Sequence, residues 1–309
     1  MSPEANPPPY LEEVSPGIFA YIQLDGGWAL NNPAFVVGQK AVTVIDGTST
    51  EQRTNDLLAA IAETSSKAVD TLVNTHHHAD HTFGNCVFGP EVTIVGQRAC
   101  REMLLADAET AVATRRGLYP GVEWGEIEIV APSVTFEEEA TLYVDDLRID
   151  LITCAPAHTT NDIIGWVPDR RVLFAGDLIF NEGTPFALQG SVAGWLSALD
   201  TLRSLDVERI IPGHGAVCGP DAIDDVTAYL RWVQILAQTG FEAGASPLEV
   251  VRDAELGRFS EWNDTERLVG NLHRAYSELR GEALGAPLAF GPVWREMIEY
   301  HGGPLSCLA

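Results

Sequence analysis

The sequence predicts an α/β protein with two β-sheets packed face to face and helices on both outer sides, a four-layer αβ/βα sandwich that continues into a helical C-terminal extension. Two observations predict this class. Strand patterns followed by helix patterns occur in two successive halves of the chain, and several strands end at loops that carry histidine or aspartate. The last part of the chain then has helical periodicity, with apolar residues at i, i+3 and i+4.

The first half starts after a proline-rich lead, residues 1–15, which we expect to be flexible. Short apolar segments bounded by glycine or asparagine predict four strands, at 17–24, 33–38, 41–46 and 68–75. A helical pattern over 51–64 precedes the last of them. A strand at 91–97 and one long helix at 98–116 follow, and the turn-rich, aromatic segment 117–132 is a candidate lid over a site.

The second half repeats this order of elements. Strand patterns occupy residues 141–145, 147–154, 162–168 and 171–177. A helix at about 192–205 and a strand at 207–215 complete the two-sheet domain, which we place at residues 16–220. We assign residues 221–309 to the helical extension and expect it to pack on the same core.

Composition restricts the function. The chain has 309 residues and a net charge of −25, so nucleic acid and anionic membranes would meet repulsion instead of a basic surface. The sequence shows no signal-peptide pattern and no long uncharged apolar run, which favours a cytoplasmic protein that does not enter a membrane. Five cysteines without a C-x-x-C pair indicate free thiols. A homo-oligomer is compatible with all of these features.

The stretch THHHADH, residues 75–81, is the main candidate site. His76 and His78 are two residues apart at the end of a strand, where alternation points both imidazoles to the same side and lets them bind one ion. Asp80 and His81 follow at the start of a predicted helix and offer ligands to a neighbouring ion, whereas His77 faces elsewhere. A solvated polar loop is the alternative, but four candidate ligands so close together favour metal binding.

Further candidate ligands follow later strands. His158 lies in CAPAHTTND, His214 lies in PGHGAV, and Asp177 ends the strand pattern RVLFAGD. The glycine before Asp177 lets the backbone approach closely, which suits a carboxylate placed between two ions. The parts of a metal centre are therefore distributed over both halves of the domain.

In this order, THHHADH, AHTTND, FAGD and PGHG resemble the metallo-β-lactamase superfamily of dinuclear hydrolases, over roughly residues 16–217. The resemblance implies the four-layer metallo-β-lactamase sandwich and two divalent metal ions. The implied ligands are His76, His78 and His158 for the first ion, Asp80, His81 and His214 for the second, and Asp177 as the bridge. Asp46, in VIDGTST, matches an aspartate that orients the metal-binding loop through hydrogen bonds. Zinc is the expected metal, and manganese and iron are alternatives for the same ligands.

Two such ions would lower the pKa of a bridging water toward ~7 and polarise a carbonyl, which opens the hydrolysis of esters, thioesters, lactones and amides. Asp177 as the bridge and Asp80 as a proton acceptor or relay are the expected catalytic carboxylates. The non-enzyme alternative is a silent metal-binding scaffold. It predicts the loss of ligands, and none is lost.

Two further segments, TPFALQGSVAGWLSALDTL and GNLHRAYSELRG, are similar to the cyclase/thioesterases of bacterial aromatic (type II) polyketide biosynthesis, which leads to antibiotics. This resemblance implies hydrolysis or ring closure of a poly-β-ketone thioester, either bound to an acyl carrier protein or as a small molecule. Acyl carrier proteins are acidic, so docking would need local arginines, and the candidates are Arg98, Arg101, Arg115 and Arg116. A lactonase or general esterase is the alternative, and a β-lactamase is less favoured because no export signal is seen.

We expect the substrate pocket to be apolar and aromatic. The candidates flank ligand loops or lie in the candidate lid: Trp28, Phe83, Tyr119, Trp124 and Phe186. Core packing is the alternative explanation for each of them. Gln189 is a further candidate, as a hydrogen-bond partner of a substrate oxygen.

Overall fold

Two mixed β-sheets form the centre of the protein in this computed structural model, which describes residues 7–309. The first sheet has the strand order β1-β2-β3-β4-β5-β6-β7, and the second has the order β12-β11-β10-β9-β8. The strands of the first sheet are β1 (Tyr10–Ser15), β2 (Ile18–Ile22), β3 (Ala34–Val37), β4 (Val42–Ile45), β5 (Val69–Asn74), β6 (Thr93–Gln97) and β7 (Val134–Phe136). Those of the second are β8 (Glu139–Val144), β9 (Leu147–Thr153), β10 (Ile163–Val167), β11 (Val172–Phe180) and β12 (Arg209–His214).

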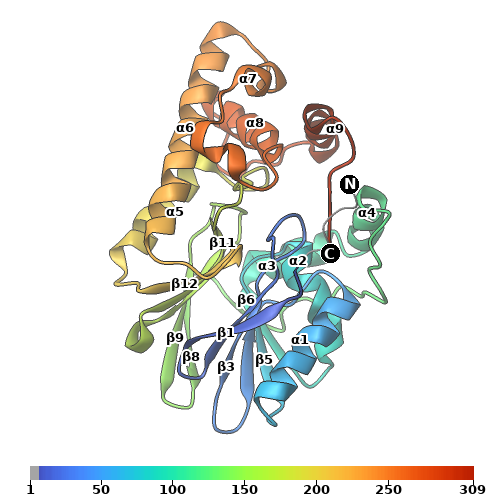
Figure 1. Ribbon diagram of the computed structural model, residues 1–309, viewed down its shortest axis with the longest axis vertical. Helices are drawn as coiled ribbons and strands as arrows, with labels where there is room; N and C mark the ends of the chain where they lie inside the picture. Colours follow the sequence, from blue (N-terminus) through green and yellow to red (C-terminus); the bar gives the residue numbers. More distant parts are fainter. Residues whose placement is uncertain (1–6) are drawn as a thin grey trace.

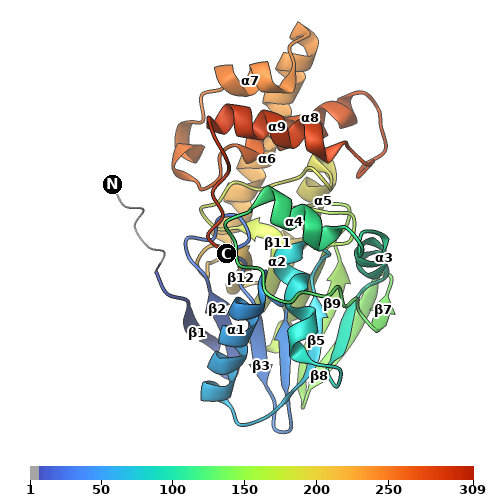
Figure 2. The ribbon, with the colours of Figure 1, turned by 90° about the vertical axis from the view of Figure 1, so that its right-hand side faces the viewer.

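The sheets pack face to face because each has an apolar inner face. Val73 of the first sheet and Phe174 of the second belong to one buried cluster between them. On the outer side of the first sheet, α1 (Glu51–Thr64) buries Leu57, and on the outer side of the second lies α5 (Val192–Ser204). The result is the αβ/βα order that the sequence predicts, seen from two sides in Figures 1 and 2.

The C-terminal part is helical, as predicted. Its helices are α6 (Asp221–Ala243), α7 (Pro247–Asp253), α8 (Arg267–Leu279) and α9 (Phe290–His301), with a short 3₁₀ turn at Gly257–Glu261. They gather at one end of the sandwich (Figure 1). Leu230, Leu272 and Trp294 from three of these helices join the apolar cluster outside the second sheet. Within residues 7–309, the helices are too short or too polar to cross a bilayer.

We predicted a flexible lead over residues 1–15. This prediction is wrong for residues 10–15, which form β1. This strand pairs with β2 in antiparallel register, with Tyr10 opposite Ile22 and Glu13 opposite Phe19. The sequence pattern does not reveal this strand, because an edge strand that is only partly buried needs no regular alternation of apolar and polar residues. The first six residues of the predicted lead lie outside the described part of the chain.

The single helix expected at 98–116 is also wrong, because two helices occupy this segment. They are α3 (Arg98–Ala106) and α4 (Ala111–Leu118). The break lies where the carbonyl oxygen of Asp107 accepts hydrogen bonds from the backbone N–H groups of both Thr110 and Ala111. This tight turn lets α4 run toward the end of the sandwich where the candidate site lies (Figure 2).

Candidate metal centre

The candidate ligands of the first sheet follow β5. The chain leaves this strand through His76 and His78 and enters α2 (Ala79–Thr82), which contains Asp80 and His81. His76, His78 and His81 are buried, and Asp80 is partly exposed. A short connection therefore places four potential ligands at one end of the sheet.

The second sheet supplies the remaining three. His158 lies in the loop between β9 and β10, Asp177 lies within β11, and His214 ends β12. Strands β11 and β12 are parallel neighbours, and a Cβ atom on Gly213 would lie 2.0 Å from Asp177 Oδ1. Glycine at this position therefore provides the space for the carboxylate.

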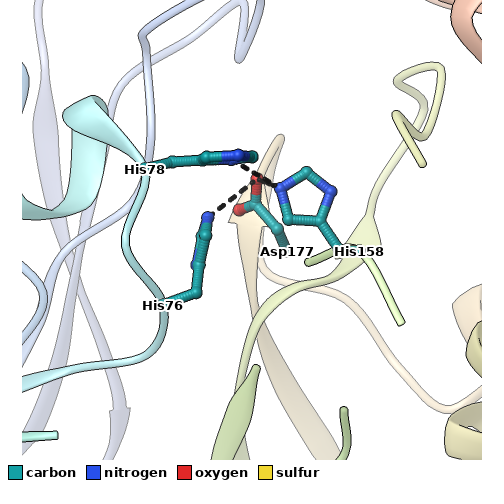
Figure 3. A group of neighbouring side chains, drawn as sticks. All are labelled: His76, His78, His158 and Asp177. Atoms are coloured by element: carbon teal, nitrogen blue, oxygen red, sulfur yellow. Dashed lines mark hydrogen bonds and ion pairs between the residues drawn. The ribbon is translucent and has the colours of Figure 1, made fainter. Parts of the chain in front are cut away.

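These side chains form two groups, and the ligand atoms within each lie within 4.8 Å of one another. The first group is His76, His78, His158 and Asp177, and the second is Asp80, His81 and His214. Figure 3 shows the first group converging on one point, two side chains from the loop after β5 and two from the second sheet. The division into two groups is the one expected from the sequence.

Asp177 contacts both groups. Its Oδ2 atom lies 3.2 Å from His158 Nε2 and 3.4 Å from His214 Nε2, and its Oδ1 atom lies 3.1 Å from His81 Nε2. Asp80 stays within the second group, with its Oδ2 atom 3.3 Å from His214 Nε2. Asp177 is therefore the carboxylate placed to bridge two ions.

The buried polar atoms at the centre fit bound cations. His76 Nε2, His81 Nε2 and Asp177 Oδ1 have no hydrogen-bond partner in the protein. His78 Nδ1 and His158 Nε2 lie 2.8 Å apart. An unpartnered buried polar atom costs about 1–3 kcal/mol, and a cation among these nitrogen and oxygen atoms would satisfy all of them.

Backbone carbonyl groups orient two of the imidazoles. His158 Nδ1 lies 2.6 Å from the carbonyl oxygen of Phe186, and His214 Nδ1 lies 3.0 Å from that of Gly26. A carbonyl oxygen only accepts, so each Nδ1 carries a proton and Nε2 is the ring nitrogen left to bind a cation at the centre. The tautomers therefore suit metal binding.

Asp46 orients the histidine loop. Its Oδ1 atom accepts a hydrogen bond from the Thr75 N–H at 2.7 Å, and its Oδ2 atom accepts from the Thr75 hydroxyl at 2.7 Å and from His81 Nδ1 at 2.8 Å. The residue has φ 63°, in the left-handed region that aspartate tolerates. Asp46 thus holds both the start of the loop and the tautomer of His81.

Gln189, expected as a hydrogen-bond partner of a substrate oxygen, contacts a candidate ligand. Its Oε1 atom accepts from His78 Nε2 at 2.8 Å. The other ring nitrogen, Nδ1, is then the one directed at His158 and the centre of the first group. Sequence reasoning missed this role because the two residues are 111 positions apart.

Burial and carboxylates set the protonation of the site. Burial lowers the pKa of His158 to about 4 because an imidazolium loses its hydration there. Burial acts the same way on His214, but Asp177 and Asp80 outweigh it and raise its pKa to about 9, and the pKa of His81 is raised for the same reason. A cation that binds displaces the protons of His81 and His214, so metal affinity should fall as the pH drops below about 9.

Helix α8 holds the segment 184–189, which carries Phe186 and Gln189. Arg267, Asn271 and Arg274 lie at i, i+4 and i+7 on one face of this helix and are buried. They donate hydrogen bonds of 2.7 to 3.0 Å to three backbone carbonyl oxygens of the segment, those of Thr184, Pro185 and Leu188 respectively. The C-terminal helices therefore support the partners of His158 and His78.

A small inner cavity of about 40 Å³ lies over both groups and adjoins an outer groove of about 250 Å³. Most of the predicted pocket residues line the inner cavity: Trp28, Tyr119, Trp124, Phe186 and Gln189. Phe83 lines the outer groove instead. The candidate lid 117–132 thus contributes two aromatic side chains to the cavity wall.

Other lining residues were not identified as such from the sequence. They are Arg115, Phe180, Arg267, Phe290 and Trp294. Phe290 and Trp294 come from α9, and their rings stack with centroids 5.2 Å apart. Their i, i+4 spacing was the only local signal, and it indicates an apolar helix face without showing what the face covers.

The family model described as the metallo-beta-lactamase superfamily matches residues 26–214, more than half of the chain. The chain belongs to the metallo-β-lactamase superfamily. The matched region contains all seven candidate ligands.

The relatives of this superfamily member are named for different enzymatic activities. The linear primary-alkylsulfatase of Pseudomonas sp. is 22% identical over 70% of this chain, and the match spans only about half, 48%, of that protein. The metallo-beta-lactamase type 2 of Bacteroides fragilis is 22% identical over 69% of this chain and 82% of its own. A hydroxyacylglutathione hydrolase of Synechococcus sp. is 28% identical over 57% of this chain and 59% of its own.

Solved structures show the same fold. The DIM-1 metallo-beta-lactamase superimposes with a TM-score of 0.59 and 19% identity, covering 73% of this chain and 98% of that one. The uncovered part of this superfamily member makes up about a quarter of its length.

Proposed function

We propose that this protein is a dinuclear metal-dependent hydrolase of thioesters or esters, and that its substrate is a poly-β-ketone thioester of polyketide biosynthesis. One observation carries the proposal. The Asp177 carboxylate contacts both groups of candidate ligands beneath an aromatic cavity. This is the arrangement that two-metal hydrolysis requires.

Two divalent cations, most simply zinc, would be held by these seven side chains and would supply a hydroxide nucleophile at neutral pH and polarise the attacked carbonyl. Other side chains orient the metal ligands, and one carboxylate transfers protons. Asp177 links the two groups, while Asp46 and Gln189 keep His81 and His78 in the required tautomers. Asp80, in the cavity wall, is placed to accept a proton from the attacking water and to return it to the departing thiol.

The shape of the cavity supports a substrate with a flat, extended acyl chain. The inner cavity of about 40 Å³ has room for a reacting group with a water molecule, and the outer groove of about 250 Å³ has room for the rest of the chain. Aromatic walls exclude water and pack against flat groups. The similarity to a hydroxyacylglutathione hydrolase agrees with an acyl thiol substrate. We propose that the acyl chain arrives on an acyl carrier protein or as a released small molecule.

The test is thiol release from a β-ketoacyl thioester by zinc-loaded protein, measured beside a chelated sample and beside a simple lactone. We expect release that requires metal and a preference for the thioester. Cleavage of the lactone alone would leave the dinuclear hydrolase and overturn the polyketide substrate. Failure to cleave either compound by protein with two zinc ions per chain would overturn the hydrolase itself.

A further inference from the structure

Three residues within 115–124 line the inner cavity and carry hydrogen-bond donors without a protein partner. Tyr119 and Trp124 are only 4% and 3% exposed, yet the Tyr119 hydroxyl and the Trp124 Nε1 atom have no hydrogen-bond partner in the protein. Arg115 lies one helical turn before Tyr119 and is half-buried. Throughout residues 7–309, nothing forms an ion pair or hydrogen bond with its guanidinium group.

Two buried aromatic side chains elsewhere in the protein show how such donors are paired. Trp195 Nε1 donates to the Leu178 carbonyl oxygen at 3.1 Å, and the Tyr276 hydroxyl donates to that of Ala245 at 3.0 Å. Leaving a buried donor without a partner is unfavourable, because it has given up its hydrogen bond to water. The concentration of unpaired donors at one cavity therefore indicates that a ligand completes their hydrogen bonds.

We propose that Arg115, Tyr119 and Trp124 bind a planar, anionic pair of oxygen atoms on the substrate, beside the bond that is cleaved. This proposal rests on the proposed function, because it names the substrate class of the same site. An indole N–H only donates, and a guanidinium binds two oxygens through parallel N–H groups. A carboxylate and the enolate of a β-dicarbonyl unit both present such a pair. Burial raises the pKa of Tyr119, so its hydroxyl keeps the proton that it donates.

The other charges at the cavity are already compensated. Arg267 also lines it, but its guanidinium pairs with Asp264 at 2.7 Å and lies 4.2 Å from the centre of the Trp28 ring. Asp80 and Asp177 belong to the metal groups. In a chain of net charge −25, Arg115 therefore supplies the local positive charge that attracts an anion.

The position of Arg115 indicates which part of the substrate carries the anionic oxygen pair. This side chain lines both the inner cavity and the outer groove, as do Gln189 and Phe290. A substrate that reaches from the groove to the metal groups passes these residues. The anionic pair therefore lies close to the reacting carbonyl, as the next carbonyl of a poly-β-ketone would.

Calorimetric binding to zinc-loaded protein tests the donors without requiring turnover. The probes are an aromatic carboxylate and a cyclic 1,3-diketone. Arg115→Gln should lose about 10-fold in affinity, and Tyr119→Phe about 3- to 10-fold. The matched controls are Arg148→Gln, an exposed arginine that pairs with Asp150 away from the cavity, and Tyr276→Phe, and both should bind as the wild type does.

The two probes also separate the two anions. A loss confined to the carboxylate assigns a carboxylate, and a loss confined to the diketone, larger at a pH where the enolate forms, assigns an enolate. Unchanged affinities of both probes in Arg115→Gln and Tyr119→Phe would overturn the proposal. Thermal unfolding provides a check on folding: Tyr119→Phe should keep or raise Tm because an unpaired hydroxyl is removed, while Tyr276→Phe should lower it.

Turnover distinguishes this proposal from the function on which it rests. The ratio of kcat/KM for a β-ketoacyl thioester to that for a plain acyl thioester should fall about 10-fold in Arg115→Gln and stay constant in Arg148→Gln. If thioesters are cleaved while this ratio and the probe affinities are unchanged, the donor site fails and the hydrolase stands. If no thioester is cleaved but probe affinity falls, the donor site stands and the substrate assignment fails.

Discussion

The two-sheet core and the C-terminal helices contribute to one site in different ways. All seven candidate ligands lie in the core, within residues 76–214, and the C-terminal helices supply none of them. Helix α8 instead supplies three buried polar side chains, Arg267, Asn271 and Arg274, that hold the segment carrying Gln189. The core thus supplies both the ligands and the groups that orient them, and the C-terminal helices hold the segment that carries two of those orienting groups.

Replacing Asp177 by Asn tests the contribution of the core and has the largest expected effect. Asparagine keeps the shape but presents an N–H group to imidazole nitrogens and cannot bridge two cations by charge. Turnover should fall at least about 100-fold, whereas Tm should change by only a few degrees. Zinc content and kcat measured on the same sample check this. Wild-type turnover would refute the bridge.

Asp46→Asn tests orientation within the core. The new amide would meet His81 Nδ1, which now donates to Asp46 at 2.8 Å, and would favour the tautomer whose Nε2 carries the proton. Affinity for the second metal should fall about 10- to 100-fold. Zinc titration measures this, with Asp145→Asn as control, because Asp145 also has positive φ but lies away from the site. Equal affinities in both variants would contradict the role of Asp46.

Asn271→Ala tests the contribution of the C-terminal helices. The change removes hydrogen bonds to the Ala187 N–H at 2.7 Å and the Pro185 carbonyl at 2.8 Å, so the free energy of unfolding should drop by about 1–3 kcal/mol. Zinc affinity of the first group should fall about 10-fold as the segment loosens. The exposed Gln238→Ala on α6 is the control. A loss of stability with unchanged zinc affinity would show that α8 only packs.

His77→Gln has the smallest expected effect on the metals. Its backbone N–H donates to Asn161 Oδ1 at 3.0 Å, and its ring belongs to neither ligand group. Zinc content after gel filtration should equal that of the wild type, while His76→Gln, one position earlier, should lose zinc. Loss of zinc from the His77 variant would place that residue among the ligands.

Local sequence patterns predicted the elements that depend on neighbours in the chain. The helix expected at 51–64 has those bounds, because an amphipathic repeat and the Thr50 cap both act within a few residues. The prediction of one long helix at 98–116 failed. The turn at Asp107 breaks the helix, although the helical spacing of apolar residues continues on both sides of it. The prediction of a flexible lead failed at residues 10–15, because hydrogen bonding to β2 stabilises a strand that local periodicity does not reveal.

The sequence by itself predicted which imidazoles and carboxylates are candidate ligands, and its resemblance to the superfamily implied their division into two groups with Asp177 between them. Tertiary structure alone decided how they are held and what faces them. The contacts of His158 with the Phe186 carbonyl, of Gln189 with His78 and of Asn271 with Ala187 join residues 28, 111 and 84 positions apart. Periodicity and capping act over a few residues, whereas burial, hydrogen-bond pairing and unpaired donors depend on which surfaces the fold brings together.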